Sequence, residues 1–117
     1  MRLVLAASAA LLLSAVAALA DDDVMATRYG NTVVSKSASG LEVHMYYKAD
    51  HSFTGKVIGV DFALKGTWKA DGGNICLTYD PPPPGMTNPV CLPAVAHQVG
   101  DTWTAGDRTA TLVQGIQ

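Results

Sequence analysis

Apolar and polar residues alternate along most of the chain from Thr32 onward, which is the period of a half-buried β-strand. Glycine, asparagine, aspartate and serine interrupt the alternation at short intervals, as turns do. The pattern predicts strands over residues 32–36, 41–48, 52–57, 60–70, 74–79, 90–96, 99–104 and 108–113. Before them, three aspartates at residues 21–23, the segment 24–29 and Gly30 predict a short helix.

A meander of about eight short strands favours an up-and-down barrel, because closure removes exposed strand edges. We therefore predict an all-β barrel preceded by a short helix, with a two-sheet β-sandwich as the alternative. One face of each strand should point inward, and its bulky groups would nearly fill so short a barrel. Gly55 and Gly66 would mark corners of the strands. The predicted core comprises Met45, Tyr47, Phe53, Phe62, Leu64, Trp68, Ile75, Leu77 and Leu112.

The first twenty residues have the parts of a secretory signal peptide: a basic start at Arg2, an apolar run and an Ala-x-Ala ending at Ala20. A membrane anchor is the alternative, but the run is mostly alanine and ends in a cleavage site. We expect cleavage after Ala20, one domain over residues 21–117, and a periplasmic or secreted protein of bacterial type. That domain carries seven basic residues (8 − 1) against ten acidic ones, a net charge of −3, which argues against nucleic acid and anionic membrane surfaces as partners.

Both cysteines, Cys76 and Cys91, follow the signal peptide. In an oxidising compartment two cysteines at this spacing most simply form one disulfide. A zinc site would need more ligands at close spacing, and a redox pair would have its cysteines closer together. We predict a structural disulfide that contributes about 3 kcal/mol of stability.

The segment between the cysteines holds five of the six prolines. If Cys76 and Cys91 lie opposite each other, Thr78 faces Pro89 and Asp80 faces Thr87, so the tip spans residues 81–86. Four consecutive prolines favour a stiff polyproline II segment, which lacks the N–H groups that a ladder requires. The loop is a candidate partner-binding surface, or else a passive and ordered connection. Its candidate contact residues are Pro81, Pro82, Pro83, Pro84 and Met86.

A second candidate surface is the polar stripe of Glu42, His44 and Tyr46 on the outward face of strand 41–48, which is otherwise an ordinary solvated face. Catalysis is not expected, because Glu42 is the single glutamate and no nucleophile elbow or phosphate loop occurs. The histidines lie on an outward face or at turns, and they have no partner at metal-ligand spacing. We therefore predict a non-enzymatic protein without a metal or another cofactor. Trp103 should cap one end of the barrel.

Five segments carry a resemblance: RYGNTVVSKSASG, YYKADHSFTG, KGTWKADGGNICLTY, HQVGDTW and TLVQG. In this order they resemble small exported bacterial proteins of unassigned function, over nearly all of residues 21–117. A more distant likeness, through Gly66-Thr67-Trp68 and the disulfide, is to the calycin barrels, which include lipocalins and periplasmic metalloprotease inhibitors. In those families the Gly-x-Trp lies on the first strand, whereas here it lies mid-chain, so no inhibitory residue carries over.

Two functions follow from these observations. The first is an exported binding or inhibitor-like module that acts through its surface loops on another exported protein. The alternative is a lipocalin-like carrier that holds a small apolar ligand inside the barrel. The interior volume distinguishes them, because a filled core around Phe62 and Trp68 would leave no room for a ligand.

Overall fold

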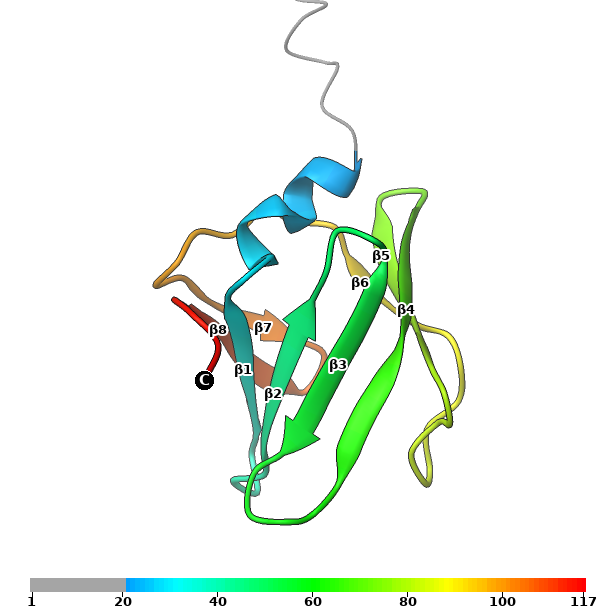
Figure 1. The fold of residues 1–117 in the computed structure, drawn as a ribbon, viewed down its shortest axis with the longest axis vertical. Helices are drawn as coiled ribbons and strands as arrows, with labels where there is room; N and C mark the ends of the chain where they lie inside the picture. The colour runs from blue at the N-terminus through cyan, green and yellow to red at the C-terminus, as the bar shows by residue number, and fades with distance from the viewer. Residues whose placement is uncertain (1–20) are drawn as a thin grey trace, which may run out of the picture.

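The computed structural model describes residues 21–117, and the predicted signal peptide, residues 1–20, lies outside them. The described chain forms a single antiparallel sheet of eight strands that curls into a nearly closed barrel (Figure 1). A short 3-10 helix precedes the strands. The elements are η2 (Asp21–Arg28), β1 (Thr32–Ser37), β2 (Glu42–Tyr47), β3 (Ser52–Val57), β4 (Ala63–Asp71), β5 (Asn74–Tyr79), β6 (Val90–Pro93), β7 (Thr102–Ala105) and β8 (Arg108–Val113). The predicted all-β barrel is confirmed, and the two-sheet alternative is wrong.

The strands pair in the order β6-β5-β4-β3-β2-β1-β8-β7, so the last long strand, β8, lies beside the first. Within residues 21–117 no ladder joins β6 to β7, and the barrel stays open at this seam. Both seam strands are shorter than the predicted 90–96 and 99–104, with four residues each. Pro89 precedes β6 and Pro93 is its last residue, and neither has an N–H to donate, which limits the ladder there. The segment 94–101 then crosses between the two strands without regular structure.

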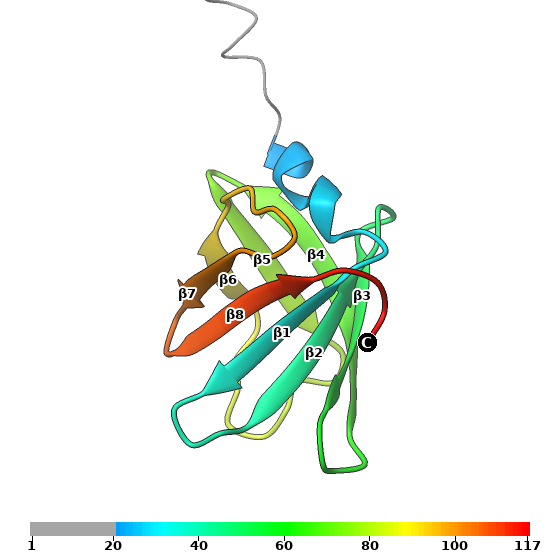
Figure 2. The same cartoon turned by 90° about the vertical axis from the view of Figure 1, so that its left-hand side faces the viewer.

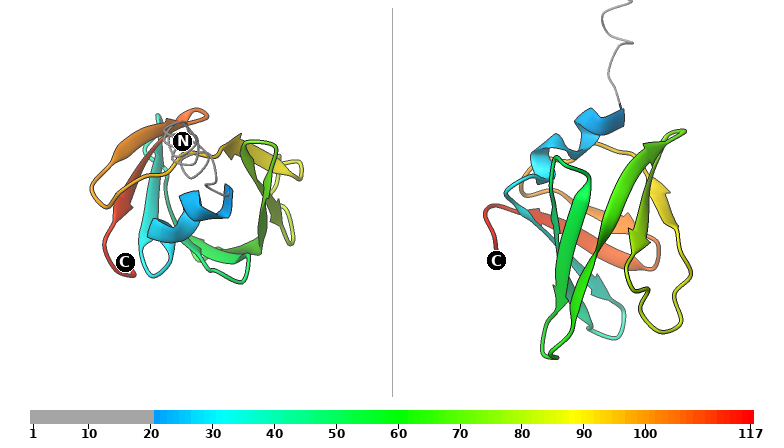
Figure 3. Two further views of the ribbon diagram at one scale, coloured as in Figure 1. Left: turned by 90° about the horizontal axis from the view of Figure 1, so that it is seen from above. Right: turned by 45° about the vertical axis from the view of Figure 1, so that its right-hand side comes forward.

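The up-and-down topology sorts the connections between the two ends of the barrel. The connections β1–β2, β3–β4, β5–β6 and β7–β8 lie at one end, which we call the loop end. The opposite end, which we call the helix end, holds η2 and the segment 94–101 (Figure 2). Viewed from above, η2 lies across the ring of strands (Figure 3). The helix therefore covers one opening of the barrel and leaves the other to the loops.

The buried core follows the predicted inward faces with one exception. Leu64 and Trp68 are buried as predicted, but Phe62 is 43% exposed, so its assignment to the core is wrong. A tight turn precedes β4, in which the Val57 amide donates to the Phe62 carbonyl at 3.1 Å, and it places Phe62 at the rim of the loop end. Met25 of η2 joins the core. The full set is Met25, Val33, Val43, Met45, Tyr47, Phe53, Leu64, Trp68, Ile75, Leu77, Ala110 and Leu112.

Gly66 is a position where the fold tolerates no side chain. A Cβ placed there would lie 2.0 Å from the Thr78 carbonyl oxygen and 2.8 Å from the Phe53 ring. The ring of Phe53 packs over this bare backbone and meets the Tyr79 ring edge-on, with centroids 5.1 Å apart. The absence of a side chain at Gly66 therefore makes room for the Phe53–Tyr79 pair, a more specific steric requirement than the strand corner predicted from the sequence.

Candidate functional site

The barrel contains a cavity of about 820 Å³ whose wall is mostly apolar and whose rim is open to solvent at exposed residues such as Pro84, Met86 and Asp107. The predicted filling of the interior is therefore wrong. Part of the remaining space is explained by two almost fully buried rings, those of Trp68 and Phe53, because neither of them lines the cavity. Trp68 stacks on His51 at a centroid distance of 3.9 Å and lies beside Tyr29 near η2. The rings of Tyr47, Phe62, Tyr79 and Trp103 do line the cavity. Smaller apolar side chains make up much of the rest of the wall, among them Val33, Val43, Met45, Val57, Leu64, Ile75, Leu77, Val90, Leu92 and Ala110.

The proline loop forms part of the rim of this cavity. Pro83, Pro84 and Met86 line it at the loop end, together with the half-exposed side chains of Leu41 and Phe62. The other two candidate residues, Pro81 and Pro82, are exposed and do not line the cavity. Of the five predicted contact residues of the loop, three therefore lie at the opening of the barrel and two lie away from it.

The predicted disulfide holds the base of the proline loop. Cys76 and Cys91 are bonded and lie directly opposite each other on β5 and β6. The ladder ends at the next pair, Leu77 and Val90, so the predicted pairing of Thr78 with Pro89 does not form. The Asn88 side chain takes over from the backbone: its amide donates to the Tyr79 carbonyl at 2.7 Å, and its oxygen accepts from the Tyr79 amide at 2.9 Å. These contacts fix both arms of the loop beside the cavity rim.

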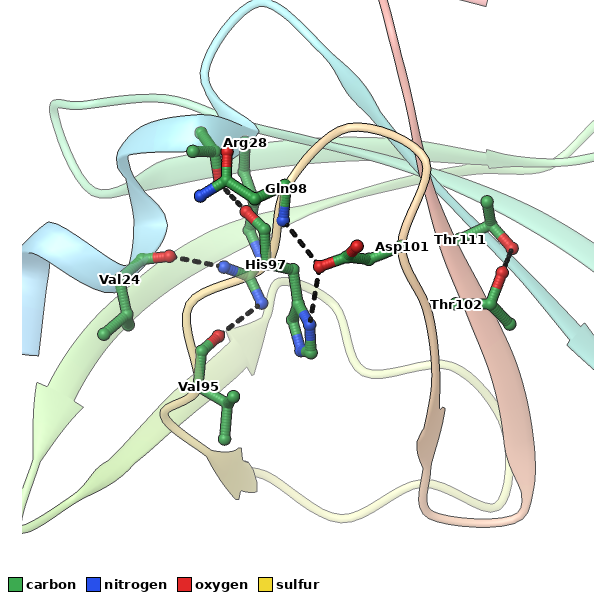
Figure 4. A network of polar contacts seen from close by, with 9 residues as sticks. Val24, Arg28, Val95, His97, Gln98, Asp101, Thr102 and Thr111 are labelled. Carbon is green, nitrogen blue, oxygen red and sulfur yellow. Dashed lines mark hydrogen bonds and ion pairs between the residues drawn. The ribbon is translucent and has the colours of Figure 1, made fainter.

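A buried cation closes the helix end. Arg28 is 8% exposed and donates to the carbonyl oxygens of Val24 at 2.6 Å and Val95 at 3.3 Å (Figure 4). Its guanidinium lies 5.6 Å from the centre of the Trp103 ring. Burial lowers the pKa of Arg28, an effect that nearby Tyr47 and Tyr29 oppose. The contact joins η2 to the segment 94–101, and Trp103 lines the cavity below it, consistent with its predicted capping position.

His97 completes this closed end. Its ring stacks on Trp103 at 3.6 Å, and its Nδ1 lies 4.0 Å from Asp101 Oδ2, which also accepts a hydrogen bond from the Gln98 amide (Figure 4). Burial and the charge of Arg28 lower the pKa of His97, while Asp101 acts in the opposite direction. The imidazole is thus favoured in its neutral form in the folded protein.

A second arginine reaches the cavity from the loop end. Arg108 is the first residue of β8 and precedes two inward residues at period two, Ala110 and Leu112. Its Nη1 is buried and has no hydrogen-bond partner among the described residues. Across the seam, burial of Tyr79 raises the pKa of its hydroxyl, and the positive charge of Arg108 partly opposes this rise. Arg108 and Tyr79 therefore present polar groups to an otherwise apolar wall.

The predicted polar stripe lies on the opposite surface of β2, away from the cavity. Glu42 and His44 meet at 2.6 Å, and the hydrogen bond from His44 is the main cause of the lowered pKa of Glu42. Tyr46 lies apart from them and donates to the Gln117 carbonyl at 2.8 Å. His44 is only 9% exposed, so its prediction as a solvated outer residue is wrong. The three residues thus make contacts with one another or with the C-terminus, while Glu42 and Tyr46 stay partly exposed.

The sequence analysis did not identify Arg28 and Arg108 as residues of the cavity wall, although the strand pattern around Arg108 could have indicated it. Arg108 is a charged residue at the start of an inward apolar series, where period-two alternation predicts a hydrophobic side chain. No comparable pattern marks Arg28, because a basic residue in the last turn of a helix is usually solvated.

Within residues 21–117 no helix is long and apolar enough to cross a bilayer. The chain was also compared with known proteins. No known protein family, curated protein or solved structure matches it.

Proposed function

We propose that this is a non-enzymatic binding protein that holds a small apolar ligand inside its barrel. The cavity carries the proposal: about 820 Å³ falls within the range of about 300–1,000 Å³ that small-molecule sites occupy. Its wall is mostly aliphatic, with a few polar groups at its two ends. This is the composition that small-molecule sites share.

The cavity volume supports the second of the two functions expected from the sequence, the carrier. A filled barrel would have left the loops as the main surface for binding a partner, whereas an open interior favours the carrier. The proline loop keeps a role in this proposal, since Pro83, Pro84 and Met86 line the rim that a ligand would pass. An exported location agrees with the disulfide, which persists in oxidising compartments.

The proposal is tested by titrating folded residues 21–117 with N-phenyl-naphthylamine, a neutral probe whose fluorescence rises in apolar surroundings. We expect one saturable site. Ala110→Phe places a ring in the cavity and should weaken probe binding roughly tenfold or more. Thr109→Phe is the matched control, because it adds the same ring to the exposed face of β8 and should leave binding unchanged. If Ala110→Phe does not fold, Val57→Phe serves at another lining position.

An absence of saturable binding, or equal loss in the Ala110 and Thr109 variants, would contradict the carrier function. The loop-acting module predicted from the sequence would then be the better account. Affinity capture with the folded domain from the exported fraction would be the next step in that case.

A further inference from the structure

The charges on the cavity wall are unbalanced. Two arginines, Arg28 and Arg108, line the cavity against one carboxylate, Asp107, which is exposed at the β7–β8 turn. Among the side chains of residues 24–117, the ion pairs are Lys36–Glu42, His44–Glu42, Lys69–Asp71 and His97–Asp101, none of which includes an arginine. Guanidinium groups keep their charge in proteins. A ligand in this cavity therefore meets a positive wall.

The two arginines differ in how far the protein satisfies them. Two backbone carbonyls and the face of Trp103 surround the Arg28 guanidinium. Arg108 has a buried Nη1 without an acceptor. Leaving a buried charged donor unpaired is costly, and an acceptor that carries negative charge removes that cost most effectively. Among residues 24–117, the Arg108 Nη1 is thus the charged donor on this wall that lacks an acceptor.

The surroundings of Arg108 suit a small head group. Ser35 of β1 lies opposite Ala110 in the ladder, one inward position along from Arg108, and it also lines the cavity. Tyr79 faces the site from β5, and its raised pKa keeps the hydroxyl protonated and able to donate. Beyond these groups the wall becomes aliphatic at Val43, Leu64 and Leu77. Of the two arginines, Arg108 has the buried nitrogen without an acceptor, and it lies beside a long apolar surface, which matches a molecule with a single charged end.

We infer that the cavity binds an amphipathic monoanion, a carboxylate on a hydrocarbon body, with the carboxylate at Arg108 and the hydrocarbon along the aliphatic wall. This inference rests on the proposed carrier function and specifies its ligand class. The planar guanidinium can donate two parallel hydrogen bonds to a carboxylate, which a neutral alcohol cannot accept in the same way. A multiply charged ligand fits less well, since among residues 24–117 the cavity offers one buried guanidinium nitrogen without an acceptor, the Arg108 Nη1.

The test compares two ligands with the same chain, laurate and dodecanol, as competitors of the neutral naphthylamine probe at neutral pH. In the unmodified protein laurate should compete at least about tenfold more tightly than dodecanol, a difference of about 1.4 kcal/mol. Arg108→Gln should abolish this preference and leave competition by dodecanol unchanged. Lys36→Gln is the control: it removes a charge from an exposed side chain on the neighbouring strand and should preserve the preference.

Three results would overturn the inference: equal competition by both ligands in the unmodified protein, equal weakening of both by Arg108→Gln, or loss of the preference in Arg28→Gln alone. The last would place the head group at the helix end. If Arg108→Gln does not fold, Arg108→Lys keeps the charge without the planar fork and should reduce the laurate preference. Failure of the neutral probe to bind at all would instead refute the carrier function, and this inference with it.

Discussion

Replacing Trp68 with alanine tests the packing that leaves the cavity open. Trp68 is 2% exposed, and its ring lies between His51 and Tyr29. Its indole N–H donates to the Lys48 carbonyl at 3.0 Å. The side chain thus ties β4 to the β2–β3 turn and to the segment that follows η2.

The expected loss of stability follows from these contacts. A buried tryptophan removes about 150–250 Å² from water, worth about 4–6 kcal/mol at about 25 cal/mol per Å². Partial collapse of the site brings the observed range for Trp→Ala to about 3–5 kcal/mol. Small domains have about 5–15 kcal/mol in total, so Trp68→Ala should leave a marginal fold. At about 4–8 °C for each kcal/mol, the melting temperature should fall by about 12–40 °C.

Urea unfolding followed by circular dichroism measures this change. Trp68→Phe keeps much of the ring contact but not the N–H, so its loss should be clearly smaller than that of alanine. Lys69→Ala, on the exposed face of the same strand, is the control and should change stability by less than about 0.5 kcal/mol. A loss below about 1 kcal/mol for Trp68→Ala would refute the inward assignment of this strand face.

Three further predictions concern the closed end and the loop. The double change Cys76→Ser with Cys91→Ser should lower the free energy of unfolding by about 3 kcal/mol, measured by urea titration, because it frees the loop in the unfolded chain; an unchanged midpoint would contradict this. Stability should fall as the pH drops through about 6.5, because the lowered pKa of His97 lets the unfolded chain bind the proton first. His97→Gln should flatten that part of the pH profile, and an identical slope in both proteins would exclude His97 as its source. Replacing residues 81–84 with Gly-Ser repeats should leave the barrel folded but weaken probe binding, since the flexible rim loses more conformational entropy when it closes on a ligand; unfolding of the variant would show instead that the loop is structural.

Much of the fold could be predicted because alternation and turn residues are local properties. The bounds of β3, β5 and β8 agree with the predicted strands, and the disulfide was predicted from the expected compartment and from the cysteine spacing. The errors occur where a turn or proline competes with the pattern. Phe62 continues the alternation of β4, but the preceding turn moves it to the rim. Similarly, Pro93 ends β6 earlier than its apolar neighbours suggest.

The candidate site was harder to predict, because a cavity depends on how side chains pack in three dimensions. The inward residues were nearly all identified, but their summed bulk suggested a full interior. Trp68 and Phe53 instead pack against His51 and over Gly66, and neither ring lines the cavity. His44 likewise lies on the predicted outer face, yet it is buried there by contacts that alternation does not encode.

The central claim, an apolar ligand inside the barrel, is tested most directly by methyl NMR of methionine. The three methionines of residues 21–117 all line the cavity: Met25 on η2, Met45 on β2 and Met86 in the proline loop. Titration with dodecanol should shift the buried Met45 methyl signal saturably at one equivalent, with Met25 and Met86 reporting the two ends. A shift confined to the exposed Met86, or no saturable shift at Met45, would show that the interior admits no ligand and would contradict the account.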